Sequence, residues 1–221
     1  MVVGSLTIDT DVAIIGSGPA GYVAAIRAAQ LGKDVTLIEE NKELGGVCLN
    51  SGCIPTKAVI HASSALHSLG HFEEMGIHIE KTSFDIAKMK EWKGGIIKKL
   101  NTGIKGLCEK YGIEVIEGKA SFTSSDTIHV EGKSDVNAIN FKKAIIATGS
   151  SQIEVPGFSF DNKYIIGSKE ALELDEVPEK LVIIGGGYIG TEMGTVYAEL
   201  GSEVHIIEMR DALLPEIESE I

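Results

Sequence analysis

The sequence predicts an α/β protein with two strand–turn–helix–strand units and a small antiparallel β-meander between them. An apolar strand-like run leads into a glycine-rich turn and a helical stretch twice, in DVAIIGSGPAG at 11–21 and LVIIGGGYIG at 181–190. Short alternating runs fill 113–143. With 221 residues and 43% hydrophobic residues, the chain is long enough for one large or two small domains with proper cores.

The first unit carries a glycine fingerprint. Gly16, Gly18 and Gly21 are followed by a helical stretch at 22–31 and by the strand DVTLIEE, which ends near Glu39. In Rossmann-like dinucleotide-binding folds, the three glycines make the tight turn, admit the pyrophosphate close to the backbone, and let helix and strand pack closely. The helix N-terminus stabilises the pyrophosphate charge. The carboxylate accepts hydrogen bonds from ribose hydroxyls.

The second unit repeats this design. Gly185, Gly187 and Gly190 precede a helical stretch and the strand EVHIIE, which ends at Glu208. The first glycine and the acid are equally far apart in both copies, 39 − 16 = 23 and 208 − 185 = 23. One such motif is often an ordinary turn, but two copies with a correctly placed acid predict two dinucleotides. Glu208 favours NAD over NADP, because a carboxylate repels a 2′-phosphate. We expect this second nucleotide domain to be incomplete, because the sequence ends soon after its second strand.

A cysteine pair lies in the segment GGVCLNSGCIPTK at 45–57. Cys48 and Cys53 have a spacing that can close a small disulfide loop, and the N-terminus shows no secretory signal, which favours a redox-active pair. Apolar positions recur with helical spacing after Pro55, so Cys53 is predicted at the start of a helix, where the helix dipole stabilises a thiolate. A zinc site needs about four ligands, and two inert buried cysteines would leave the flanking glycines and proline unexplained.

The remaining sequence is mostly structural in character. Residues 84–108 form a predicted amphipathic helix, and Cys108 beside its apolar face is expected to be a buried packing residue. His61, His67 and His71 are expected on the helix that follows the cysteines, in exposed positions, and their spacing predicts no metal site. The segment KKAIIATGSS at 142–151 is expected to form a returning strand followed by a glycine turn. The linker character of SSQIEVPG indicates a boundary near residue 150, with one partial dinucleotide-binding domain at 1–150 and a second at 151–221.

The bulk charge argues against two classes of partner. The formal net charge of −12 disfavours nucleic acid and anionic membrane surfaces. No run of about 18 apolar residues is present, so no transmembrane helix is predicted. We expect a cytoplasmic location.

Several motifs together resemble the flavoprotein disulfide reductase family, also called the pyridine nucleotide–disulfide oxidoreductases. They are CLNSGCIPTK, GSGPAG at 16–21, ATGS at 147–150 and GGGYIGTEMG at 185–194. The resemblance covers essentially the whole chain and implies FAD and NAD as cofactors. It implies that FAD contacts Gly16, Gly18, Gly21, Glu39, Gly45, Gly46, Lys57, Ala120, Thr148, Gly149 and Ser150. It implies that NAD contacts Gly185, Gly187, Tyr188, Ile189, Gly190 and Glu208.

The resemblance also implies catalytic roles. Cys53 is the expected charge-transfer thiol against the flavin, and Cys48 the expected interchange thiol that attacks a substrate disulfide. Lys57 is expected near the reactive flavin nitrogen, where a positive charge stabilises reduced flavin, with Glu192 as its partner. Tyr188 matches an aromatic residue that covers the nicotinamide side. The implied reaction is oxidation of dihydrolipoamide to lipoamide with NAD as acceptor.

The resemblance finally implies partners and further segments. The expected partner is the lipoyl domain of 2-oxoacid dehydrogenase complexes, and the full-length protein is expected to be a homodimer. Its interface domain, beyond this sequence, supplies a His–Glu acid–base pair, so we expect no turnover from the isolated chain. The alternatives are an NADH-dependent reductase of another disulfide or a metal ion, or a non-catalytic nucleotide-binding fragment.

Overall fold

A computed structural model describes residues 6–72, 75–132, 134–215 and 217–218 of the chain. It divides into two compact units, each built from two separate stretches of sequence. The first unit contains the residues up to 50 together with 97–151, and the second contains 51–96 together with the residues from 152 onward. These units are defined by packing alone, so the functional division at residue 150 stays a prediction.

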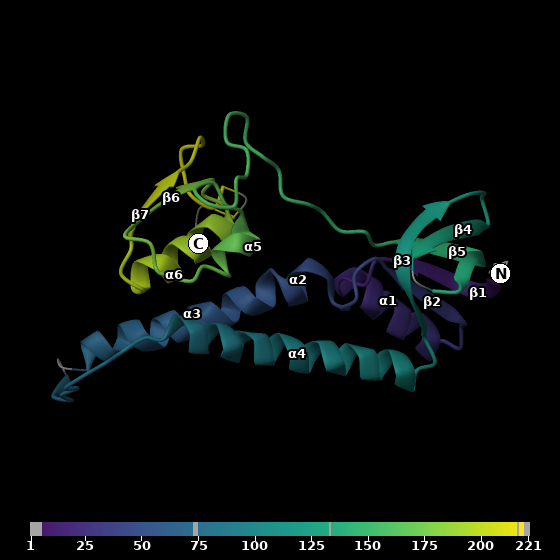
Figure 1. Cartoon of the computed structure of the whole chain (residues 1–221), viewed down its shortest axis with the longest axis horizontal. Coiled ribbons are helices and arrows are strands. Elements are labelled where there is room, and N and C mark those ends of the chain that lie inside the picture. Colours follow the sequence, from purple (N-terminus) through teal and green to yellow (C-terminus); the bar gives the residue numbers. More distant parts are fainter. Residues whose placement is uncertain (1–5, 73–74, 133, 216, 219–221) are drawn as a thin grey trace. The chain divides into compact units, whose positions relative to one another are not determined.

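The first unit is a closed five-stranded sheet with both parallel and antiparallel pairs (Figure 1). β1 pairs in parallel with β2 and β5, and β2 in parallel with β3, whereas β4 is antiparallel to β3 and β5. The predicted α/β class, the Rossmann-like first unit and the antiparallel meander are therefore confirmed. The strands are β1 (Leu6–Ile15), β2 (Val35–Glu39), β3 (Glu114–Phe122), β4 (Thr127–Gly132) and β5 (Val136–Ile146).

The meander has fewer and longer strands than its alternating runs predicted. β3 continues through the runs IEVIEG and ASF without a turn. β5 joins the last meander run to the expected returning strand. Because β5 is 11 residues long, it pairs with β4 near its start and with β1 from Leu6↔Val136 to Ile15↔Ile146, which closes the sheet. Apolar side chains from all five strands fill the interior, including Ile38, Ile128 and Ile139.

The helices lie largely where hydrophobic periodicity placed them. α1 begins with a proline, which suits the first helical position. α2 and α5 are short elements that the sequence did not predict. The helices are α1 (Pro19–Gln30), α2 (Gly46–Asn50), α3 (Cys53–Ser68), the 3₁₀ helix η1 (Leu69–His71), α4 (Ile86–Lys110), α5 (Ser168–Ala171) and α6 (Tyr188–Glu199).

Two helix predictions need correction. α4 was predicted at 84–108 but covers Ile86–Lys110, because the Asp85 carboxylate accepts from the Lys88 N–H at 3.0 Å and caps the helix start. Gly112, with φ +65°, follows the helix end.

His71 was expected on the same helix as His61, but α3 ends at Ser68 and the chain tightens into η1. All three histidines are exposed, as predicted.

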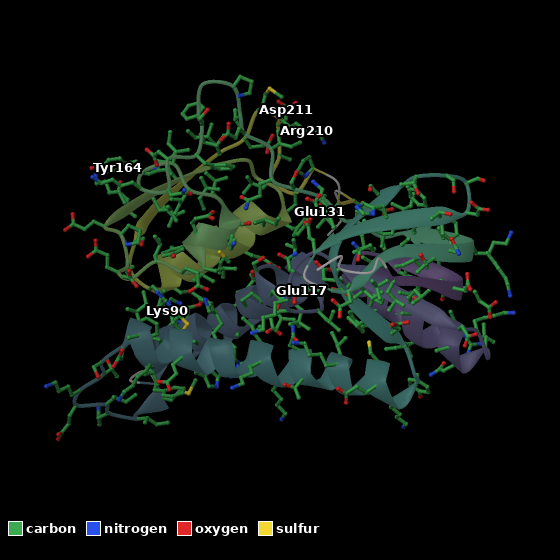
Figure 2. The ribbon with its side chains drawn as sticks, turned by 45° about the vertical axis from the view of Figure 1, so that its right-hand side comes forward. Lys90, Glu117, Glu131, Tyr164, Arg210 and Asp211 are labelled. Atoms are coloured by element: carbon green, nitrogen blue, oxygen red, sulfur yellow. The ribbon has the colours of Figure 1, made fainter. Side chains whose placement is uncertain are left out.

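The second unit packs helices against a two-stranded parallel sheet of β6 (Lys180–Ile184) and β7 (Glu203–Ile207). Its core joins α3, α6 and the segment after α5 through Val59, Leu172 and Val196. Lys93 on α4 is 2% exposed and donates to the Leu172 carbonyl and to the Glu173 carboxylate, so this buried charge is paired. Lys90, labelled in Figure 2, donates to the Glu173 carbonyl at 2.8 Å.

We predict that Gly21→Ala destabilises the first unit. A Cβ at Gly21 would lie 1.8 Å from the Gly16 carbonyl oxygen, a backbone atom that has no room to move. The expected loss is at least about 1–3 kcal/mol in the free energy of unfolding, the usual cost of overpacking. Urea unfolding of both proteins measures it. Gly103→Ala on α4 is the control, because no heavy atom lies within 4 Å of that Cβ, and helix propensity makes this change neutral or stabilising. Equal stability of the two variants would contradict the packing argument.

Candidate functional site

The first glycine turn brings three backbone segments together. Gly16 has φ +95°, which suits glycine, and its N–H donates to the Ile38 carbonyl at 2.8 Å. A Cβ there would lie 2.3 Å from the Ala147 carbonyl oxygen. Gly21 is packed against Gly16 itself. Only glycine fits these two positions, so the turn holds β1, α1 and the end of β5 at close approach.

The carboxylate of Glu39 is held at the end of β2 by four hydrogen bonds. Ser17 donates to Oε2 from its N–H at 2.8 Å and its hydroxyl at 2.6 Å. Asn41 donates to Oε1 from its N–H at 2.9 Å and its side-chain amide at 2.8 Å. Glu39 is 7% exposed. Burial raises the pKa of this carboxyl, but the hydrogen bonds from Ser17 and Asn41 outweigh it and leave the pKa below its ordinary value.

The second glycine turn has the same backbone design. Gly185 has φ +109° and donates to the Ile207 carbonyl at 2.8 Å. A Cβ at Gly190 would lie 2.2 Å from the Gly185 carbonyl oxygen. Glu208 accepts from the Gly186 N–H at 2.7 Å and from the Arg210 N–H at 2.9 Å. The backbone hydrogen bond from Arg210, followed by that from Gly186, lowers the pKa of Glu208.

A third glycine turn leads from β2 toward the cysteine segment. Gly45 and Gly46 both have positive φ, at +99° and +60°. The Gly45 N–H donates to the Ser17 carbonyl at 2.9 Å, and a Cβ at Gly46 would lie 2.7 Å from the Gly18 Cα. The turn is therefore packed directly against the first dinucleotide-binding turn, within the first unit.

Two asparagines hold this third turn in place. The Leu44 carbonyl accepts from the side-chain amide of Asn101 at 2.6 Å and from that of Asn50 at 2.9 Å. Asn50 also donates to the Gly46 carbonyl at 3.0 Å. Asn101 is 3% exposed. Since the Leu44 oxygen can only accept, these contacts fix the orientation of both amides.

The two cysteines of the central motif lie on successive helices. Cys48 is half-buried on α2, and Cys53 is exposed as the first residue of α3. The prediction that Cys53 begins a helix is confirmed. Pro55 lies buried in the first turn of that helix, as expected.

Lys57 and Glu192 form an ion pair between α3 and α6 within the second unit. The Lys57 side chain is 60% exposed and that of Glu192 is 30% exposed. An ion pair this open to solvent adds little to stability. The structure thus brings together the two residues expected as partners, with the ammonium group accessible to a ligand.

The other predicted cofactor contacts lie at element ends or on strands. Ala120 lies on β3 opposite Val130. Thr148, Gly149 and Ser150 form an exposed loop after β5, with φ +72° at Gly149. At the start of α6, Tyr188 is 68% exposed and Ile189 is 46% exposed. The loop at 148–150 and the start of α6 are exposed, whereas Ala120 is half-buried and packs against the core of the sheet.

A cavity of about 370 Å³ lies beside Glu39 and Asn41 in the first unit. Lys105 and Glu117 also line it, and Glu117 is labelled in Figure 2. Cys108 lies at its wall and is 1% exposed, which confirms the expected buried position. Burial, and to a lesser degree the neighbouring Glu109, raises the pKa of the Cys108 thiol, so it is a poor nucleophile.

Two further features concern metals and membranes. Across the described ranges, no three His, Cys, Asp or Glu side chains converge in a way that would hold a metal ion. Within the same part of the chain, no helix combines the length and apolar character needed to cross a membrane.

The family comparison agrees with this geometry. The model of the pyridine nucleotide-disulphide oxidoreductases matches residues 10–221. The chain belongs to this family. Among similar proteins, the dihydrolipoyl dehydrogenase of Geobacillus stearothermophilus is 49% identical over 221 residues, which is all of this chain and 47% of the relative. That of Halobacterium salinarum is 48% identical, over the whole chain and 47% of the relative. The chain thus spans about half the length of these curated relatives.

Solved structures agree on the fold. The HOCl-induced flavoprotein disulfide reductase RclA from Escherichia coli superposes with a TM-score of 0.78 at 31% identity, over 96% of this chain and 45% of that one. LpdA from Mycobacterium tuberculosis superposes with a TM-score of 0.84 at 24% identity, over 95% of this chain and 46% of that one. At this identity the second match supports the fold alone.

Proteins of this family use FAD and NAD(H), and the structure fits two dinucleotides. Each glycine turn leaves no room for a side chain at its third glycine and presents a carboxylate at the end of the next strand. Sequence analysis missed Ser17, Asn41 and Asn101. The hydroxyl inside GSGPAG is the only signal that could have indicated the first of these.

We predict that Glu39→Gln flattens the acid dependence of stability. The folded pKa of Glu39 lies below its ordinary value of 4.5, so its stabilising contribution is complete above that pH and is lost as the pH falls through the folded pKa. Urea unfolding of both proteins from pH 6 to about pH 3 gives the slopes. Glu40→Gln, at the exposed neighbouring position, should keep the wild-type slope. If Glu39→Gln also keeps it, the hydrogen-bonded carboxylate is not the cause.

Proposed function

We propose that this chain provides the nucleotide-binding and dithiol part of an NAD-dependent dihydrolipoamide dehydrogenase. The observation that carries the proposal is the direct packing of the Gly45–Gly46 turn against the first dinucleotide-binding turn. α2 begins at Gly46 and carries Cys48, so the redox motif starts where the nucleotide is expected to bind. The relatives named dihydrolipoyl dehydrogenase support the choice of substrate.

The proposed FAD site lies on the first unit. Gly16, Gly18 and Gly21 admit the pyrophosphate, and Glu39 accepts from the adenosine ribose. Gly45 and Gly46, Ala120, and the loop at 148–150 are the proposed further contacts. When bound, FAD accepts two electrons from the dithiol and delivers them to NAD as hydride.

The proposed dithiol chemistry divides between two cysteines. The two thiols of dihydrolipoamide exchange with a Cys48–Cys53 disulfide, which gives the disulfide of lipoamide and two cysteine thiols. Cys48 is the interchange thiol, and Cys53 is the thiol on the flavin side, exposed at the α3 start. The Lys57 ammonium, oriented by Glu192, supplies positive charge near the flavin ring.

The proposed NAD site lies on the second turn, with Gly185, Gly187 and Gly190 at the pyrophosphate. Glu208 accepts from the adenosine ribose and disfavours a 2′-phosphate, so NAD is the proposed acceptor. Tyr188 and Ile189, exposed at the start of α6, are the proposed contacts on the nicotinamide side.

We also propose the setting in which the whole protein works. Its partner is the lipoyl domain of a 2-oxoacid dehydrogenase complex, and it acts as a homodimer in the cytoplasm. A catalytic dithiol suits that compartment, where other cysteines are kept reduced. The isolated 221-residue chain is expected to show no multiple turnover of lipoamide with NADH.

Cys48→Ser tests the division of roles. We expect the variant to keep its flavin but to lose exchange with lipoamide, because the remaining thiol lies on the flavin side. The measurement is mass spectrometry of the prereduced chain after one equivalent of lipoamide, together with the visible flavin spectrum. Cys108→Ser is the matched control and should exchange normally, because that thiol is buried. Normal exchange by Cys48→Ser, or loss of its flavin, contradicts the assignment.

A further inference from the structure

The two fingerprint carboxylates differ in how many hydrogen bonds they already accept. An ionised carboxylate offers about four acceptor positions. Glu39 receives four donors, two on each oxygen. Glu208 accepts from the backbone N–H groups of Gly186 and Arg210, and the Met209 backbone and the Arg210 charge also lower its pKa. The first carboxylate is saturated by the protein, and half of its donors come from side chains.

The difference comes from two side chains. Ser17 of the first turn corresponds to Gly186 of the second, so the first copy has a hydroxyl donor that the second lacks. A Cβ at Gly186 would lie 2.5 Å from the Leu213 Cδ2 and 3.3 Å from the Glu208 Oε2, so the second turn has no room for a side chain there. Asn41 supplies the other extra donor, through its side-chain amide at 2.8 Å.

These side chains add two donors to a buried carboxylate that already accepts from the backbone N–H groups of Ser17 and Asn41. Ser17 is fully buried and its hydroxyl lies 2.6 Å from Oε2. Charge-assisted hydrogen bonds of this length are among the stronger ones in proteins. A ribose binds a carboxylate through two neighbouring hydroxyls, which need one acceptor position on each oxygen. At Glu39, one acceptor position on each oxygen is taken by a side-chain donor.

We propose that the adenosine ribose binds to the first unit by exchange, with its two hydroxyls displacing the Ser17 hydroxyl and the Asn41 amide from Glu39. The inference rests on the proposed FAD site. The backbone N–H groups of Ser17 and Asn41 keep their bonds, so the carboxylate stays oriented during the exchange. Ser17 and Asn41 thus set the affinity of the first site, and they lower it.

Ser17→Ala tests the exchange. The variant removes the competing hydroxyl alone, and Ser17 is not among the non-glycine residues with positive φ, so alanine fits the backbone. We expect the variant chain to bind FAD about 3- to 10-fold more tightly than the wild-type chain, measured by flavin fluorescence. An FAD analogue with 2′,3′-dideoxyadenosine should show no such gain, because it has no hydroxyls to place on Glu39. Asn41→Ala, at an exposed position, should give a smaller gain.

Ser64→Ala is the matched control. Ser64 also donates to a glutamate, at 3.0 Å to Glu199 in the second unit, and its loss should leave FAD affinity unchanged. Unchanged or weaker FAD binding by both Ser17→Ala and Asn41→Ala, with binding by the wild-type chain, overturns the exchange and leaves the FAD site standing. An equal gain with the dideoxy analogue also overturns it. Absence of FAD binding by the wild-type chain and both variants overturns the FAD site and the exchange together.

Discussion

Close backbone contact at the glycine turns is the constraint on which the rest of this structure depends. A Cβ at Gly21 would lie 1.8 Å, and a Cβ at Gly190 2.2 Å, from a carbonyl oxygen of the same turn. A Cβ at Gly46 would lie 2.7 Å from the Gly18 Cα. Because the backbones touch, β1, α1 and the part of the cysteine segment up to Asn50 have a fixed geometry in the first unit. The first glycine turn and the start of the cysteine segment are then consequences of one packing arrangement.

Hydrogen bonds from polar side chains also hold the turns of the first unit in place, in addition to the glycine contacts. Asn101 on α4 and Asn50 on α2 both donate to the Leu44 carbonyl, which precedes two residues in left-handed conformation. A buried carbonyl outside regular structure needs such partners. Ser17 and Asn41 do the same for the Glu39 carboxylate. The first unit therefore holds the groups that we propose bind the ligand in place with its own donors, and in our proposal the ligand competes with some of these donors.

Local sequence patterns predicted the glycine turns and the helix start at Cys53. They did not predict which strands pair, or which side chains contact residues far away in the sequence. The pairing of Lys57 with Glu192, 135 residues away, was anticipated only from the family resemblance. The closure of the sheet by β5 was not anticipated, because alternation reveals a strand but not which strands it pairs with. The contact of Asn101 with Leu44 spans 57 residues, and a single polar residue on an amphipathic helix gives no sign of such a partner.

The central proposal is that this chain binds FAD and that Cys53 is the thiol on the flavin side. The most direct test is the visible absorption spectrum of the purified chain, before and after anaerobic addition of dithionite. We predict a flavin spectrum that gains a long-wavelength band on two-electron reduction, as a Cys53 thiolate lies against the flavin. A colourless protein that also fails to take up added FAD would contradict the claim.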